Sequence, residues 1–256
     1  AGLLDAVAGP APGDPYFAPP PERGFASEVG REPGRLRIGF STETPLGDPL
    51  DPACRAAILE TARLLESLGH EVEEAAPRFD AMELWQKYTT LLAAGVGWAI
   101  ADWSRRLERE ATPEILEPFV WAFSERGHQV SAPEYLLALQ DVQRQIRALS
   151  EFFVERDLWL TTTLGQPPVP LGTLVFKDDP FELRRRTAKF SPYTYLSNAS
   201  GQPAISLPLA WSEDGLPIGL HFTARFGDEA MLLRLAGQLE QTKPWSDRRP
   251  PICAAD

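Results

Sequence analysis

The sequence is poor in the residues that usually mark a metal centre or a disulfide scaffold. Its 256 residues include two cysteines, Cys54 and Cys253, with no Cys-x-x-Cys spacing, and three histidines that lie far apart. Two cysteines are too few for a disulfide framework, and zinc sites need closely spaced Cys or His ligands. We therefore expect no metal and no cofactor, and a reducing, cytoplasmic compartment.

Positive charge is also scarce. There are 25 basic and 36 acidic residues, which gives a net charge of −11. Surfaces that bind nucleic acids or anionic membranes need a basic footprint, so we expect neither partner to bind directly. No apolar run approaches the ~20 residues of a membrane span.

Motifs of a self-contained hydrolase are missing as well. The sequence has no Gly-x-Ser-x-Gly elbow and no glycine-rich phosphate loop. We interpret His70, His128 and His221 as structural or exposed side chains, because they are scattered along the chain, at a helix–strand junction, just after a helix end and inside a strand. The run Arg184-Arg-Arg186 is interpreted mainly as surface charge, with anion binding as the alternative, since three consecutive helical residues point in different directions.

The first 34 residues differ in composition from the rest. Residues 1–9 resemble the end of a helix that stops at Gly9 before Pro10, and a helix that starts without an N-cap suggests a fragment. Residues 10–34 are rich in proline and predict an extended surface connection without secondary structure. We expect 1–34 to be a truncated helix and linker, and 35–256 to be one domain.

The remainder alternates strands and helices. Asp51 followed by Pro52 predicts the start of a helix between two strands, which is typical of a parallel β–α–β unit. Residues 80–156 predict a helical insertion, with new helix starts at Thr112 and at Ser131. The fold class is therefore α/β, part of a mixed sheet flanked by helices. The predicted strands are 35–40, 70–75, 158–164, 204–211 and 217–225.

One family resemblance stands out near the carboxyl end. Residues 198–208 read Asn-Ala-Ser-Gly-Gln-Pro-Ala-Ile-Ser-Leu-Pro, and they are followed by Gly-Leu-Pro-Ile-Gly at 215–219 and by the helical residues 232–245. This string resembles the carboxyl end of the amidase signature family, whose serine hydrolases cleave C–N amide bonds. The resemblance extends through nearly the whole chain. Segments 46–72 and 245–250 most resemble the 6-aminohexanoate cyclic-dimer hydrolases within that family.

The resemblance implies a Lys–Ser–Ser triad and a Gly/Ser-rich loop that holds the oxyanion. A serine hydroxyl needs an adjacent base, and the oxyanion needs preorganised donors. The sequence contains no Gly-Gly-Ser-Ser string, and none of its four lysines stands in the family's lysine context. We therefore expect no catalytic residue in this chain, a carboxyl-terminal portion that is inactive alone, and partners that are either the missing amino-terminal half or further copies of the chain.

Four residues are candidates for the substrate pocket. Ligands gather at the carboxyl ends of strands in open α/β sheets, and Thr162, Thr163 and Gly165 leave such an end. The family usually reads Thr-Pro-Thr there, so Thr162 replaces a proline. Asn198 begins an Asn-x-x-Gly-x-Pro pattern that the family shares, although turn geometry alone could account for its Gly201.

Two other functions remain open. The chain could be a non-catalytic binding or regulatory module for amides or carboxylates. It could also be a fragment of the glutaminase subunit of a tRNA-dependent amidotransferase, because that subunit belongs to the same family.

Overall fold

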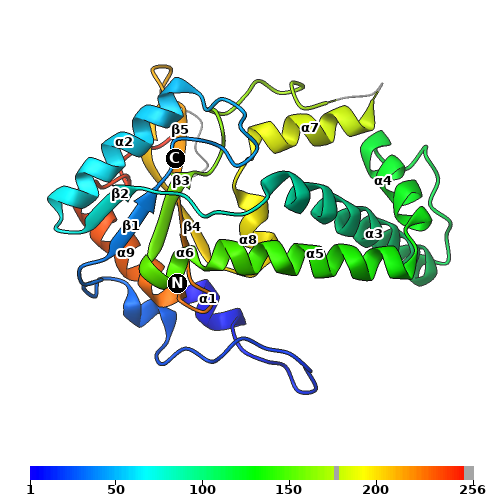
Figure 1. Cartoon of the computed structure of the whole chain (residues 1–256), viewed down its shortest axis with the longest axis horizontal. Coiled ribbons are helices and arrows are strands. Elements are labelled where there is room, and N and C mark those ends of the chain that lie inside the picture. The colour runs from blue at the N-terminus through cyan, green and yellow to red at the C-terminus, as the bar shows by residue number, and fades with distance from the viewer. Residues whose placement is uncertain (176–178, 251–256) are drawn as a thin grey trace.

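The fold is built on a five-stranded mixed sheet, which lies in the left half of Figure 1. The computed structural model describes residues 1–175 and 179–250. The strand order is β2-β1-β3-β5-β4. β1 pairs in parallel with β2 and β3, whereas β5 runs antiparallel to β3 and β4. The α/β class and all five predicted strands are confirmed, with bounds β1 Arg37–Phe40, β2 Glu71–Glu74, β3 Leu158–Thr162, β4 Ala204–Trp211 and β5 Pro217–Ala224.

The predicted β–α–β unit is also confirmed. Asp51 accepts a hydrogen bond from the backbone N–H of Ala53 at 2.8 Å and so caps α2 (Pro52–Ser67). Gly69, at φ +92°, then adopts the left-handed conformation that turns the chain into β2. The parallel register of β1 with β2 follows, because the helix returns the chain to the same end of the sheet.

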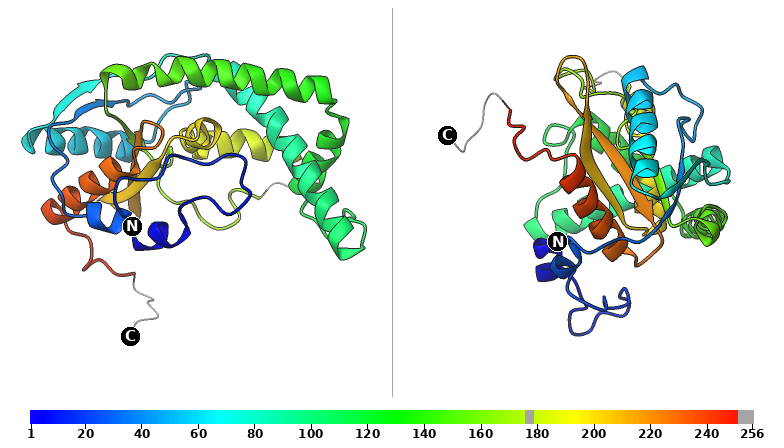
Figure 2. Two further views of the ribbon diagram at one scale, coloured as in Figure 1. Left: turned by 90° about the horizontal axis from the view of Figure 1, so that it is seen from below. Right: turned by 90° about the vertical axis from the view of Figure 1, so that its left-hand side faces the viewer.

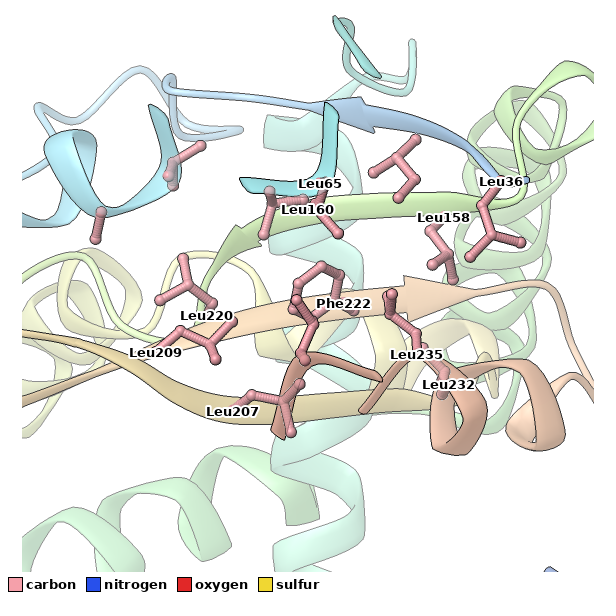
Figure 3. Packing of buried hydrophobic residues seen from close by; sticks show 14 of the residues in the cluster. Leu36, Leu65, Leu158, Leu160, Leu207, Leu209, Leu220, Phe222, Leu232 and Leu235 are labelled. Carbon is pink, nitrogen blue, oxygen red and sulfur yellow. The ribbon is translucent and has the colours of Figure 1, made fainter. Parts of the chain in front are cut away.

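The main core lies between the sheet and two helices. Alternate strand residues, among them Leu158, Leu160 and Phe222, face α2 and α9 (Glu229–Thr242), as Figure 3 shows. Figure 1 places α2 and α9 on the same side of the sheet. The opposite face carries Trp159 and packs against a second, aromatic cluster. Each strand residue therefore faces one of two different environments.

The helical insertion extends away from the sheet (Figures 1 and 2). It consists of α3 (Ala81–Leu107), α4 (Pro118–Gln129), α5 (Ala132–Ser150) and the short α6 (Phe152–Glu155). The Ser131 cap is confirmed, since its hydroxyl accepts from the Glu134 N–H at 3.3 Å. The helix start at Thr112 is wrong: residues 113–115 form a turn, and α4 begins at Pro118, where proline also suits the first helical position.

Two short segments differ from the sequence-based prediction. The stretch around Asn198 is not only a turn, because Asn198 lies in α8 (Thr194–Ser200), which ends at Gly201 with φ +73°. The 10–34 linker is not devoid of secondary structure either. It contains a 3₁₀ turn, η1 (Phe25–Glu28), in which Phe25 and Glu28 are buried.

The amino-terminal helix is held by η1. In α1 (Gly2–Val7), the Asp5 carboxylate accepts from the Phe25 and Ala26 N–H groups at 2.5 and 2.8 Å. Glu28 in turn accepts from Arg234 of α9 at 2.6 Å. Charged side chains therefore connect the first 34 residues to the body of the domain.

Candidate functional site

The four predicted pocket residues occupy three different environments around the carboxyl end of β3. Thr162 is fully buried and lies beside the Cys54 thiol of α2. Burial raises the pKa of Cys54 to about 12, so the thiol stays protonated. Side chains along a strand point alternately to the two faces of the sheet, so Thr162 lies on the same face as Leu158 and Leu160. Thr162 therefore belongs to the main core.

Thr163 faces a more polar neighbourhood. Its Oγ1 lies 2.5 Å from Oγ of Ser206, and its backbone N–H donates to the Gly219 carbonyl at 2.8 Å. A Cβ at position 219 would lie 2.7 Å from Thr163 Oγ1 and 2.6 Å from Ser206 Oγ. Only glycine leaves room for this pair of hydroxyls, which joins β3, β4 and β5 at one point.

Gly165 connects three elements through its backbone. Its N–H donates to the Phe190 carbonyl at 2.8 Å, and its carbonyl accepts from the Asp51 N–H at 2.9 Å. A Cβ there would lie 2.6 Å from the Lys189 carbonyl oxygen. Gly165 thus allows α7 (Pro180–Phe190) to approach the loop that follows β3, and its polar groups are already bonded.

Asn198 is exposed on α8, whereas Tyr195 and Leu196 of the same helix are buried in the aromatic cluster with Trp159. Five pockets of the described residues have other linings, and none of these five includes any of the four candidates. The structure brings Thr163 together with Ser206, and it does not gather the four candidates in any of these five pockets.

A pocket that sequence reasoning missed lies at the carboxyl end of β1. It measures about 370 Å³ and is lined by residues of the 42–50 loop, including Thr44, and by Arg55 of α2. Tyr193, just before α8, donates its hydroxyl to the Glu43 carbonyl at 3.1 Å and so ties this loop to the aromatic cluster. Ligands gather at the carboxyl ends of strands, and this rule applies to β1 as much as to β3. The loop after β1 could therefore have been predicted from the sequence as a pocket wall.

A second missed pocket, of about 500 Å³, lies between α3, α4 and α7. It is lined by Trp85, Arg126, Phe181 and Arg184, together with neighbouring polar residues. Its only sequence signal was the arginine run at 184–186, because its walls come from three helices that are distant in sequence.

Two of the described lysines lie in ion pairs. Lys87 pairs with Asp141 at 3.3 Å and Lys189 with Asp48 at 3.1 Å. The described part of the chain shows no hydrogen bond between a lysine ammonium and a serine hydroxyl. Lys177 lies outside the described residues.

The three histidines play structural or surface roles. Nδ1 of His70 accepts from the Leu36 N–H at 3.2 Å, so Nε2 is the protonated nitrogen that donates to Gln238 of α9 at 2.9 Å. His128 is exposed in the last turn of α4. His221 is buried in β5, and burial lowers its pKa to about 4.

The described residues offer neither a metal cluster nor a membrane-spanning helix. No group of three or more His, Cys, Asp or Glu that could hold a metal ion occurs within 1–175 and 179–250. In those ranges no helix combines the length and the apolar character needed to cross a bilayer.

Comparison with known proteins gives a consistent picture. The family model described as Amidase matches residues 1–233. The 6-aminohexanoate-cyclic-dimer hydrolase of Pseudomonas sp. (strain NK87) is 33% identical over 261 residues, and the match covers 98% of this chain and 53% of that protein. A structure of 6-aminohexanoate cyclic dimer hydrolase complexed with substrate is 32% identical with a TM-score of 0.90, covering 98% of this chain and 54% of that one.

More distant structures share the fold. A glutamyl-tRNA(Gln) amidotransferase subunit of Thermotoga maritima has a TM-score of 0.66 at 21% identity, covering 96% of this chain and 51% of that one. The chain thus spans about half the length of the curated relatives that it matches. On the family model and the 33% identical relatives together, this chain belongs to the amidase signature family.

Proposed function

We propose that this chain is the carboxyl-terminal scaffold and part of the substrate pocket of an amidase that hydrolyses C–N amide bonds. The observation that carries the proposal is the match to 6-aminohexanoate cyclic dimer hydrolase, with a TM-score of 0.90 over 98% of the chain. The substrate is a small-molecule amide, and the compartment is the cytoplasm, in keeping with only two cysteines.

The proposal includes inactivity of the chain alone. Amide hydrolysis by serine enzymes needs a nucleophile held against a base, and oxyanion donors nearby. Lys87 and Lys189 are paired with Asp141 and Asp48, and the sequence has no Gly-Gly-Ser-Ser string. A second polypeptide segment that supplies the triad is therefore the partner we propose.

The proposed pocket wall consists of Thr162, Thr163, Gly165 and Asn198. Thr163 offers a hydroxyl next to Ser206, while Thr162 and Gly165 act by packing, since one is fully buried and the other has both backbone groups bonded. Asn198 offers an exposed amide on α8. This division predicts that Thr163 is the most sensitive of the four to polar substitution.

The first test is an assay of the isolated chain on aryl and alkyl amides. We expect no turnover above the uncatalysed rate. Turnover that a serine-directed inhibitor abolishes would refute the claim that the triad lies elsewhere.

The second test is a chimera in which this chain replaces the matching part of the Pseudomonas hydrolase. We expect amidase activity that Thr163→Val lowers and that Thr173→Val, an exposed control, leaves unchanged. An inactive but folded chimera, or equal effects of the two substitutions, would contradict the proposed scaffold and pocket wall.

A non-catalytic module that binds amides or carboxylates is the second candidate. The observation in its favour is Arg184, a half-buried guanidinium in a pocket, with no carboxylate partner among the described residues. The glutaminase alternative has no comparable support, because 21% identity to an amidotransferase subunit shows the fold alone.

A further inference from the structure

The arginine run of α7 divides into two kinds of side chain. Arg185 and Arg186 are exposed, and both pair with Glu182, at 2.8 and 3.1 Å. Arg184 instead points between helices, where its guanidinium lies 5.2 Å from the ring centroid of Trp85 in α3. No ion pair reaches Arg184 from any residue within 1–175 or 179–250. The interpretation of the whole run as surface charge is therefore wrong for Arg184.

Three buried donors around Arg184 have no acceptor among the described residues. Nε of Arg184, Nε1 of Trp85 and the hydroxyl of Tyr195 are each buried with no hydrogen-bond partner in the described part of the chain. Tyr195 packs on Tyr88 with ring centroids 6.1 Å apart, and both phenols lie close enough to interact electrostatically with Arg184. Buried donors are almost always bonded, so these three groups are available to an acceptor placed against Arg184.

The protonation states are those of donors. Burial raises the pKa of Tyr195 above its usual range, so its hydroxyl keeps its proton. Burial lowers the pKa of Arg184, yet a guanidinium remains charged at neutral pH. An uncompensated half-buried cation is unfavourable, and an anion placed against it removes that penalty.

The adjacent cavity has the size and the charge for such an anion. It measures about 500 Å³, and its walls carry Lys87, Arg126, Arg184 and Arg185 and no acidic side chain. Lys87 and Arg185 are paired with Asp141 and Glu182. Trp85 and Phe181 provide aromatic surface beside the cationic groups. Aromatic walls with a few convergent polar groups are typical of small-molecule pockets.

We propose that this donor pocket, formed by Trp85, Arg126, Phe181 and Arg184 with Tyr195 behind them, binds the carboxylate of an organic acid that has an apolar stem. A carboxylate accepts several hydrogen bonds at once and matches the planar guanidinium. The stem packs on Trp85 and Phe181, which inorganic anions cannot do. This inference is independent of the amidase proposal, because it uses none of the residues at the end of β3.

Calorimetric titration of the 256-residue chain with hexanoate, hexanamide, acetate and inorganic phosphate tests the ligand class at one ionic strength. We expect saturable binding of hexanoate, at least about tenfold tighter than that of hexanamide, because the neutral amide lacks the charge. Acetate and phosphate should bind more weakly than hexanoate. Equal binding of acid and amide, tighter binding of phosphate, or no binding of hexanoate would overturn the proposal.

Substitutions then test the residues. Arg184→Gln should weaken hexanoate binding by about tenfold or more, whereas Arg186→Gln removes the same charge from the same helix and should change it little. If both variants lose hexanoate affinity equally, binding depends on the net charge of α7 and not on Arg184, and the assignment is overturned.

Tyr195→Phe separates binding from folding. The hydroxyl has no partner in the described structure, so its removal should leave the melting temperature of the free chain unchanged or higher. The same variant should bind hexanoate several-fold more weakly. A lower melting temperature without ligand, together with unchanged affinity, would show that the hydroxyl serves the fold and not the ligand, and would overturn its assignment.

Discussion

The crossing of α3 and α4 depends on a glycine, and Gly127→Ala tests it. A Cβ at Gly127 would lie 2.1 Å from the Ala93 carbonyl oxygen and 2.9 Å from its carbonyl carbon. Backbone atoms cannot rotate away as a side-chain end can, so the helices must separate by more than about 1 Å to restore ordinary contact. Gly97 of α3 lies at the same crossing, where a Cβ would come within 3.3 Å of the Ser124 carbonyl oxygen.

Two opposing effects set the magnitude. Alanine in place of a helical glycine gains about 1 kcal/mol from helix propensity. Overpacking costs about 1–3 kcal/mol, and a clash with backbone belongs at the upper end of that range. We therefore expect Gly127→Ala to lose about 2 kcal/mol of unfolding free energy net, which lowers the melting temperature by about 4–8 °C for a chain of this size.

Gly95→Ala is the matched control. Gly95 is exposed in the middle of α3, and nothing lies within 4 Å of a Cβ there. Only the propensity gain applies, so this variant should be about 1 kcal/mol more stable, with a melting temperature about 2–4 °C higher. The two variants should thus differ by about 3 kcal/mol in thermal or urea unfolding followed by circular dichroism.

The refuting result is clear. If Gly127→Ala matches or exceeds the stability of Gly95→Ala, then α3 and α4 do not cross at this glycine. Hexanoate affinity is a second readout, because Arg126 precedes Gly127 on α4 and lines the donor pocket. Gly127→Ala moves α4 away from α3 and should weaken hexanoate binding, whereas Gly95→Ala should leave the hexanoate affinity unchanged.

Three further predictions concern other parts of the chain. Burial lowers the pKa of His221 to about 4, so on acidification the unfolded chain binds this proton at a higher pH than the folded chain does. The free energy of unfolding should therefore fall as pH drops from about 6.5 to 4. His221→Gln should flatten this dependence of the free energy of unfolding on pH, and an unchanged slope would contradict the reasoning. Glu28→Gln weakens the contact with Arg234, so limited proteolysis should cut residues 10–34 faster than in the parent chain, and equal rates would argue against this anchor. β2 and β4 are the edge strands of the sheet, so sedimentation should show concentration-dependent self-association, which a monodisperse monomer would exclude.

Local signals in the sequence predicted most of the secondary structure. Asp51 with Pro52 and Ser131 with Glu134 are caps whose chemistry acts within one turn, so both helix starts were confirmed. Thr112 before a proline offered the same kind of signal and was wrong, because α4 begins six residues later. A capping residue shows only that a helix could begin there.

The outcome for the predicted site was more limited. The pattern of strand ends drew attention to Thr163, which meets Ser206, but Thr162 next to it faces the core, and Asn198 lies on a helix. A shift of one residue along a strand moves a side chain to the other face of the sheet, and the amino-acid composition does not reveal this register. The assignment of these residues to a substrate pocket remains a prediction.

By itself, the sequence determined the α/β class, the five strands and membership of the amidase signature family, since all three depend on short-range pattern and on local motifs. Only the tertiary structure decided which of three consecutive arginines is a surface charge and which is a half-buried cation. Arg185 and Arg186 find Glu182 within one helical turn, whereas Arg184 meets Trp85 and Tyr195, which belong to other helices. Burial and unpaired donors arise where distant segments pack together, and for that reason they cannot be read from the order of residues alone.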